Sequence, residues 1–187
     1  MLLVSGDSLS AAYGMPLEHG WVALLQQRLR SQGYPHHVIN TSISGETTAG
    51  GLARLPQALA KHRPQIVLIE LGANDGLRGQ SLAQMRSNLK KMISLSRKAG
   101  AQPLLFEMRL PSNYGQKYIE SFRRSFEAVA REEQVPLVPF FLTPIALQRD
   151  SFQSDGVHPT QAVQPQLLQA VWPSLEALLG KPLAAAQ

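Results

Sequence analysis

Short apolar segments alternate along this chain with longer segments in which apolar and polar residues recur at helical spacing. Five segments are mainly aliphatic or β-branched, as strands buried on both faces of a sheet are, and they lie at 2–5, 37–40, 65–70, 103–107 and 135–138. This alternation is typical of a parallel sheet that is covered by helices on both faces.

Four helices are predicted from apolar residues spaced three and four positions apart, and residues at such spacing belong to a core more often than to a cofactor site. We expect Pro165 and Pro173 to limit or bend the last helix. The four apolar stripes are Trp21, Leu24, Leu25 and Leu29; Leu82, Met85, Leu89, Met92 and Ile93; Ile119, Phe122, Phe126 and Val129; and Leu167, Leu168, Val171, Leu175 and Leu178.

These elements predict one α/β domain over residues 1–182, followed by a frayed tail at 183–187. The expected architecture is a three-layer α/β/α sandwich with a five-stranded parallel sheet, of the flavodoxin-like kind. The first residues pass directly into a strand, without the charged and apolar regions of a signal peptide.

Composition excludes several classes of function. The chain of 187 residues has no cysteine, so it has no disulfide, no zinc-thiolate site and no thiol nucleophile. Its net charge of +5 is spread over several predicted helices, and aromatic residues make up only 6% of the chain, so no basic surface interleaved with aromatics is predicted for nucleic acid. No apolar run approaches the length of a membrane span. We expect neither a nucleic-acid partner nor stable membrane insertion.

Histidines other than His158 do not suggest a metal site. The adjacent pair His36 and His37 has neither helical spacing nor carboxylate neighbours, and we interpret it, with His19 and His62, as surface histidine.

In open parallel sheets, ligands bind beyond the carboxyl ends of the strands, which directs attention to four loops. The first loop, Gly6-Asp7-Ser8, follows the first strand and is able to present the Ser8 hydroxyl as a nucleophile at the sheet edge. Asp and Ser also commonly cap helices, and this loop alone does not decide between the two roles.

The last loop places Asp155 three residues before His158, with Gly156 between them permitting a tight turn. A carboxylate that reaches Nδ1 of the imidazole would leave Nε2 free to accept the proton of a serine. The alternative is an Asx-turn, in which Asp155 bonds only to the backbone and His158 is an ordinary surface residue.

Two further loops offer hydrogen-bond donors at the same edge. Gly45 follows the second strand and lets the backbone N–H approach a ligand, while Asn74 follows the third strand and carries a neutral NH₂ group suited to an oxyanion. Either loop is also explained as a simple turn. The next loop residues, Gly76-Leu77-Arg78-Gly79, suggest a mobile lid with glycine hinges, in which Leu77 touches an acyl chain.

Taken together, the four loops resemble the four sequence blocks of the SGNH (GDSL) hydrolase family. The residues that name these blocks occur here in the same order, as Ser8, Gly45, Asn74 and His158. The resemblance covers nearly the whole chain, including the stretch around Arg109 and Pro111. One departure is Gly72-Ala73, where relatives often have two glycines.

The resemblance implies a triad of Ser8, His158 and Asp155, and an oxyanion hole made by the N–H groups of Ser8 and Gly45 and the Asn74 side chain. Asp7 and Asp75 are expected to support these loops or to cap helices. No cofactor and no metal are implied, and the residues expected to contact substrate are Leu77, Arg109 and Pro111.

The members that this chain resembles most are bacterial, periplasmic enzymes with thioesterase, protease, lysophospholipase and arylesterase activity. The resemblance therefore implies a periplasmic serine hydrolase that acts on fatty acyl thioesters, aryl esters or lysophospholipids as small-molecule substrates. We expect the protein to be a monomer. Two alternatives are a deacetylase of carbohydrates or other small acyl groups with the same catalytic set, and a flavodoxin-like binding module without catalysis. The chain lacks the glycine patterns of phosphate and dinucleotide loops that such a module would use.

Overall fold

A single five-stranded sheet forms the centre of the molecule in a computed structural model that describes residues 1–182, so the tail at 183–187 lies outside the described residues. All neighbouring strands are parallel, in the order β2-β1-β3-β4-β5. The strands lie within two residues of the predicted bounds and are β1 (Leu2–Gly6), β2 (Val38–Asn40), β3 (Ile66–Glu70), β4 (Gln102–Phe106) and β5 (Leu137–Val138).

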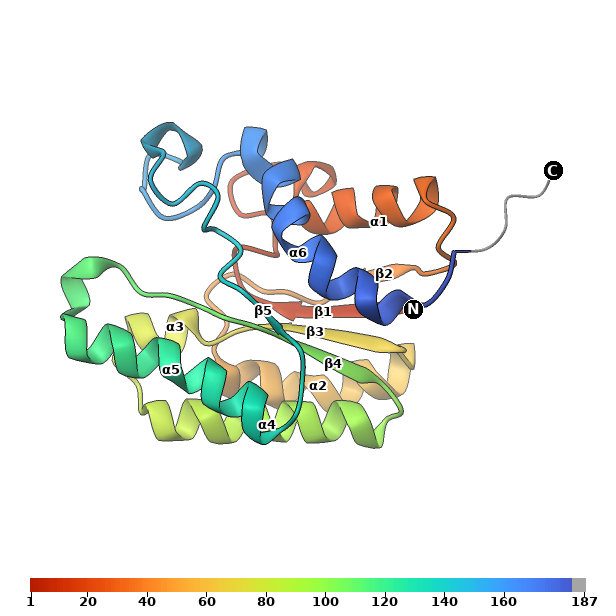
Figure 1. Cartoon of the computed structure of the whole chain (residues 1–187), viewed down its shortest axis with the longest axis horizontal. Helices are drawn as coiled ribbons and strands as arrows, with labels where there is room; N and C mark the ends of the chain where they lie inside the picture. The colour runs from red at the N-terminus through yellow and green to blue at the C-terminus, as the bar shows by residue number, and fades with distance from the viewer. Residues whose placement is uncertain (183–187) are drawn as a thin grey trace.

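Helices cover both faces of the sheet, which confirms the predicted three-layer architecture. In Figure 1, α1 and α6 lie above the sheet, while α2, α4 and α5 lie below it. The helices are α1 (Trp21–Ser31), α2 (Thr48–His62), α3 (Ala73–Leu77), α4 (Leu82–Lys98), α5 (Gln116–Glu132) and α6 (Gln164–Leu179).

The apolar stripes did not predict α2 and α3. Helix α2 contains Gly50, Gly51 and Pro56, residues of low helix propensity that obscure its apolar pattern. Gly51 is required by packing, because a Cβ at this position would lie 2.3 Å from Leu71 Cδ1 at the end of β3. Tertiary contact with the sheet thus explains a residue that local propensity disfavours.

Of the two prolines in the last helix, Pro165 limits it at its start, and Pro173 does not end it. Pro165 lies in the first turn of α6, where no backbone N–H is needed, and Pro173 lies inside the helix on its exposed side. The carbonyl that loses its partner, on Gln169, belongs to an exposed residue and is open to water. The helix therefore continues to Leu179.

His36 is buried, with 7% of its surface accessible, and the expectation that it lies on the surface was wrong. Its backbone is held by Gln26 of α1, whose side chain donates to the His36 carbonyl (3.2 Å) and accepts from the N–H of Val38 (2.8 Å). Burial lowers the pKa of His36 and favours the neutral ring.

The carboxyl ends of the strands point to the left of Figure 1, where α3 and the segment preceding α6 also lie. The loops that carry Ser8, Gly45, Asn74 and His158 meet there. None of the helices in residues 1–182 has the length and apolar character needed to span a membrane.

Candidate active site

Ser8 stands at the start of a tight turn directly after β1. The N–H groups of Ser10 and Ala11 both donate to the carbonyl of Asp7, and the Asp7 carboxylate accepts from the N–H of Leu9 (3.0 Å). Asp7 therefore caps this turn, while Ser8 is left half-buried with its hydroxyl directed to His158. The two roles considered for this loop are therefore divided between neighbours, since Asp7 caps the turn and Ser8 presents its hydroxyl.

Asp155 holds His158 in two ways at once. One carboxylate oxygen accepts from the N–H groups of Val157 (2.9 Å) and His158 (3.0 Å), and the other lies 2.7 Å from Nδ1 of the His158 ring. The Asx-turn and the contact with the imidazole, stated as alternatives from sequence, are both present. Gly156 adopts the left-handed conformation (φ +68°) that this turn requires.

The hydrogen bonds fix the tautomer of the neutral imidazole. Donation from the backbone N–H groups of His158 and Val157 lowers the pKa of Asp155 to about 2, so this group is a carboxylate that only accepts. Nδ1 of His158 must then carry the proton. Nε2 is left as an acceptor, and it lies 2.8 Å from Oγ of Ser8.

Donors converge beside Ser8. Within the described residues, the backbone N–H groups of Ser8 and Gly45 donate to no other group, so both are available to a ligand. Gly45 has φ +79°, and its carbonyl is held by the Arg78 guanidinium (2.9 Å). The Asn74 amide nitrogen donates to Asp7 Oδ2 (3.1 Å) and to the Glu46 carbonyl (3.0 Å). These two acceptors identify the atom as the nitrogen, and they occupy both of its N–H groups.

Two buried carboxyl groups, Asp7 and Glu70, lie next to Ser8. Glu70 ends β3 with no accessible surface, and its Oε2 accepts from Ser10 Oγ (2.7 Å) and the Asp7 N–H (3.2 Å). Gly6 permits this approach, because a Cβ there would lie 2.5 Å from Oε2. Burial raises the pKa of Asp7 to about 6 and that of Glu70 well above its usual value, and the negative charge of Asp7 raises Glu70 further.

The sequence pattern did not single out Glu70, because a polar residue at the end of an apolar strand is common. Asp75, by contrast, has the structural role that was considered for it. Its buried carboxylate accepts from the N–H of Thr48 (2.9 Å) and from the Thr48 hydroxyl, at the beginning of α2.

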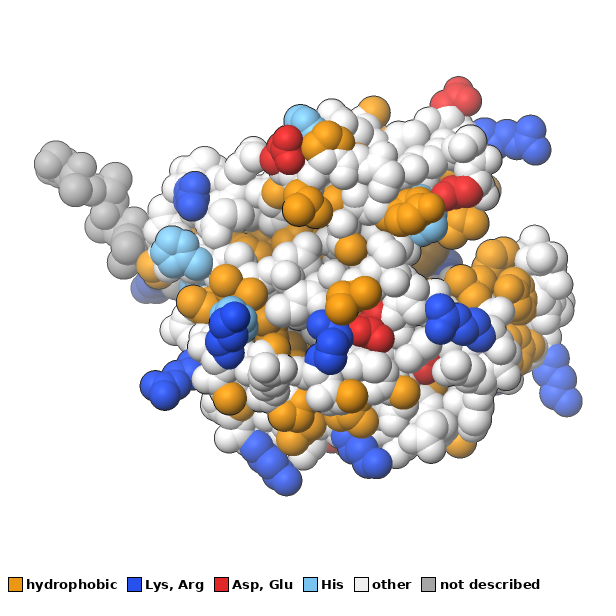
Figure 2. Space-filling view, turned by 180° about the vertical axis from the view of Figure 1, so that it is seen from behind, with side chains coloured by type: hydrophobic (Ala, Val, Ile, Leu, Met, Phe, Trp, Pro, Cys, Tyr) orange, Lys and Arg blue, Asp and Glu red, His pale blue; other side chains and the backbone are white. Residues whose placement is uncertain are grey.

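A cleft of about 580 Å³ opens beside Ser8 and is lined mainly by apolar side chains. All three expected substrate contacts, Leu77, Arg109 and Pro111, line this cleft. Arg109 is paired with Glu107 (2.8 Å) and lies over the ring of Phe140, so its charge is partly neutralised. Figure 2 shows hydrophobic side chains on both sides of a hollow at the right of that view.

No set of three or more histidine and acidic side chains in residues 1–182 is arranged to hold a metal ion. The hydrogen-bonded set of hydroxyl, imidazole and carboxylate beside unoccupied N–H donors is that of a serine hydrolase.

Comparison with known proteins agrees with this geometry. Residues 4–164 match the model of the GDSL-like lipase/acylhydrolase family. The chain belongs to this family.

Its relatives within the GDSL family cover most of its length. The esterase TesA of Pseudomonas aeruginosa is 54% identical over 95% of this chain and 89% of the relative. The thioesterase 1/protease 1/lysophospholipase L1 of Escherichia coli K12 is 45% identical over 88% of this chain and 77% of the relative.

Solved structures give the same result. A crystal structure of TesA matches with a TM-score of 0.93 at 54% identity, covering 95% of this chain and 99% of that chain. The esterase EstA from Pseudoalteromonas sp., inhibited by monoethylphosphonate, matches with a TM-score of 0.92 at 40% identity, covering 96% and 98%. The predictions of a GDSL hydrolase fold and of a serine ester hydrolase are confirmed.

Proposed function

We propose that this chain hydrolyses carboxylic esters and thioesters through an acyl-enzyme on Ser8, with His158 as the base and Asp155 holding the imidazole. The observation that carries the proposal is the continuous chain of hydrogen bonds from Ser8 Oγ to His158 Nε2 (2.8 Å) and from Nδ1 to Asp155 (2.7 Å). This arrangement provides the nucleophile with a base that is already in the required tautomer.

In the proposed cycle, His158 takes the Ser8 proton as Oγ bonds to the acyl carbon. The imidazolium then protonates the departing alcohol or thiol, and the bond between the acyl carbon and the leaving group breaks. A water molecule, deprotonated by His158, attacks the acyl-enzyme and releases the acid and Ser8. The oxyanion of each tetrahedral intermediate is stabilised by the N–H groups of Ser8 and Gly45 and by the Asn74 amide, which exchanges its bond to Asp7 or to the Glu46 carbonyl for one to the oxyanion.

The apolar lining of the cleft supports acyl groups longer than acetyl as substrates, since burial of apolar surface stabilises their binding. The relatives named above and an arylesterase of Vibrio mimicus, 48% identical over 91% of this chain, favour fatty acyl thioesters, aryl esters and lysophospholipids. A deacetylase with the same catalytic set is the alternative. A series of p-nitrophenyl esters with acyl chains of increasing length separates the two, because a deacetylase would have its highest kcat/KM on acetate.

Resemblance to periplasmic members of the family supports a periplasmic location, and we propose that the protein is a monomer. Cell fractionation and size-exclusion chromatography with light scattering test these two points separately from the activity.

A serine-directed fluorophosphonate tests the proposal directly. We expect one covalent adduct per chain, located on Ser8 by peptide mass spectrometry, and loss of ester hydrolysis in proportion to labelling. Ser8→Ala should gain no adduct, whereas the control Ser121→Ala, on the exposed side of α5, should be labelled like the unmodified protein. Labelling at another serine, or hydrolysis that survives Ser8→Ala, would reject Ser8 as the nucleophile.

A further inference from the structure

Tyr13 covers one face of the His158 imidazole. The two ring centroids are 4.2 Å apart with an interplanar angle of 32°, yet Tyr13 remains 47% exposed. Its hydroxyl makes no hydrogen bond within the described residues, so Tyr13 contacts His158 through its aromatic ring alone. The cycle proposed above gives no role to this exposed ring.

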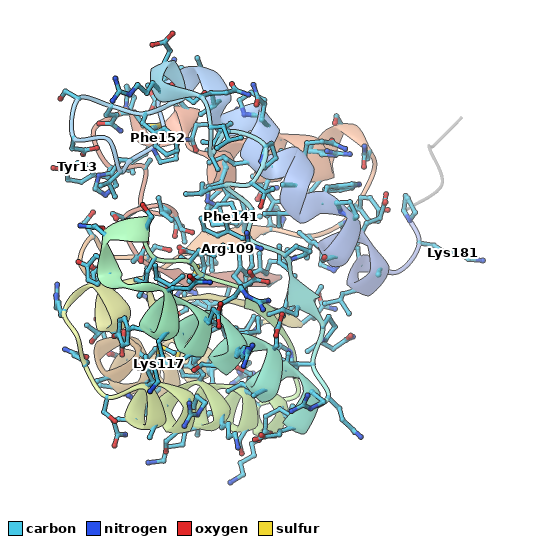
Figure 3. The ribbon with its side chains drawn as sticks, turned by 60° about the vertical axis from the view of Figure 1, so that its left-hand side comes forward. Tyr13, Arg109, Lys117, Phe141, Phe152 and Lys181 are labelled. Atoms are coloured by element: carbon cyan, nitrogen blue, oxygen red, sulfur yellow. The ribbon has the colours of Figure 1, made fainter. Side chains whose placement is uncertain are left out.

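The backbone holds Tyr13 in this place. Its N–H donates to the carbonyl of Ser8 (3.3 Å), and its carbonyl accepts from the Gln153 side chain (2.8 Å). The N–H of Gln153 in turn donates to the carbonyl of His158 (2.7 Å). Tyr13 is therefore fixed to both loops that carry the reacting groups. Figure 3 shows it in the upper left part of the view with Phe152, away from Arg109.

Stereochemistry assigns this side of the cleft to the leaving group. In the tetrahedral intermediate on Ser8, the oxyanion points to the N–H groups of Ser8 and Gly45 and to Asn74. The departing oxygen or sulfur must lie within hydrogen-bonding reach of His158 Nε2, since this atom protonates it. The alcohol or thiol portion therefore leaves along the His158 side, and the acyl chain occupies the rest of the cleft.

The surface on the His158 side is apolar and open. Tyr13 and Val157, which is 48% exposed, both line the cleft there. Exposed apolar side chains next to a reacting group offer a surface for ligand rather than for core packing. A flat aromatic leaving group would stack on the exposed part of the Tyr13 ring, as aromatic pairs do in offset arrangements.

We propose that Tyr13 and Val157 form a leaving-group subsite that selects esters and thioesters with an aromatic alcohol or thiol portion. This inference rests on the acyl-enzyme mechanism proposed above. It differs from a role of Tyr13 in positioning His158, because positioning would affect every substrate and both halves of the cycle.

Two butyrate esters separate these roles: 2-naphthyl butyrate, with an aromatic leaving group, and 2,2,2-trifluoroethyl butyrate, with a small activated one. Both give the same butyryl-enzyme. For Tyr13→Ala, we expect kcat/KM to fall roughly 3- to 10-fold on the naphthyl ester, the range of one aromatic pair, and to stay unchanged on the trifluoroethyl ester. The deacylation rate after the burst should also be unchanged.

Tyr13→Phe should behave like the unmodified protein, as should Leu17→Ala, which alters an exposed apolar residue that does not line the cleft. Tyr13→Leu repeats the measurement with an apolar but non-aromatic residue if Tyr13→Ala folds poorly. Active enzyme is counted by the phosphonate adduct. Equal losses on both esters, slower deacylation, or no loss on either would overturn the subsite. Absence of the adduct in the unmodified protein would instead reject the acyl-enzyme mechanism.

Discussion

The side-chain amide of Asn74 donates a hydrogen bond to the carboxylate of Asp7, the residue that precedes Ser8 (Nδ2 to Oδ2, 3.1 Å). This bond connects the loop after β3 to the loop after β1. A second bond from the same nitrogen to the Glu46 carbonyl (3.0 Å) connects the loop after β2. The two bonds set the position of the amide but occupy both of its N–H groups, so Asn74 donates to an oxyanion only when one of them is exchanged for the substrate oxygen.

Replacing Asn74 with alanine should lower kcat by two to three orders of magnitude, because loss of one oxyanion donor typically costs about 2.7–4 kcal/mol of transition-state stabilisation. Steady-state kinetics on a p-nitrophenyl ester measures the effect. Thermal unfolding of the same variant distinguishes lost chemistry from a lost fold, since the substitution also removes the partner of Asp7. Turnover near that of the unmodified protein would remove Asn74 from the oxyanion hole.

Asp155→Asn should lower kcat by about 10⁴, the loss seen when the corresponding carboxylate of a serine protease becomes an amide. The amide oxygen would still accept from the N–H groups of Val157 and His158, but its NH₂ would face Nδ1 and force the proton to Nε2. A proton on Nε2 prevents that atom from accepting the Ser8 hydroxyl.

The pH profile gives a second test of Asp155. Because its pKa is held at about 2, below the usual 3.8, the carboxylate keeps its charge throughout the range above pH 4. The stability that it contributes is present above pH 3.8 and is lost only as the pH falls towards 2. Loss of kcat between pH 8 and 4 in the unmodified protein must then come from the titration of another group. A finding that Asp155 itself titrates in this range would contradict the geometry.

Glu70→Gln should make stability less dependent on pH. Asp7 and Glu70 bind protons more tightly in the folded chain than in the unfolded chain, since burial raises the pKa of both. The unfolding free energy should therefore fall as the pH rises through the window from 3.8 to about 6, where Asp7 ionises, and fall further at higher pH as Glu70 ionises.

Glutamine reproduces the neutral acid and keeps an oxygen that accepts from Ser10 and the Asp7 N–H. Urea unfolding between pH 6 and 9 should show a smaller decline in the variant than in the unmodified protein. Glu18→Gln, at an exposed position, is the matched control and should leave the decline as it was. An equal decline in Glu70→Gln would mean that Glu70 is already ionised at pH 6.

Sequence predicts the meeting of Ser8 and His158, which are 150 positions apart, because the carboxyl ends of parallel strands share one edge of the sheet. It does not predict Glu70, whose partner Ser10 lies 60 positions away and is brought to it only by the pairing of β1 with β3. It also does not predict α2, because Gly51 is selected by contact with Leu71 rather than by helix propensity. Local patterns therefore identify the strands and their loops, while residues chosen by contacts across the sheet require the structure.

Gly76 has a different role from the hinge that the sequence suggested. It lies inside α3, where a Cβ would be 2.5 Å from the ring of Phe122, and its carbonyl accepts from the Tyr118 hydroxyl (3.1 Å). The carbonyl of Leu77 is held in the same way by the Tyr114 hydroxyl (3.0 Å). These contacts anchor the segment at this end and keep the Leu77 side chain in the cleft wall.

Leu77→Ala should therefore change the preference for acyl length while leaving the chemistry intact. Loss of a half-buried leucine contact costs about 1 kcal/mol, so kcat/KM on a long-chain p-nitrophenyl ester should fall roughly five-fold relative to the acetate. Leu147→Ala, at a fully exposed position outside the cleft, should leave this ratio unchanged. If the ratio is the same in Leu77→Ala as in the unmodified protein, the acyl chain does not reach Leu77.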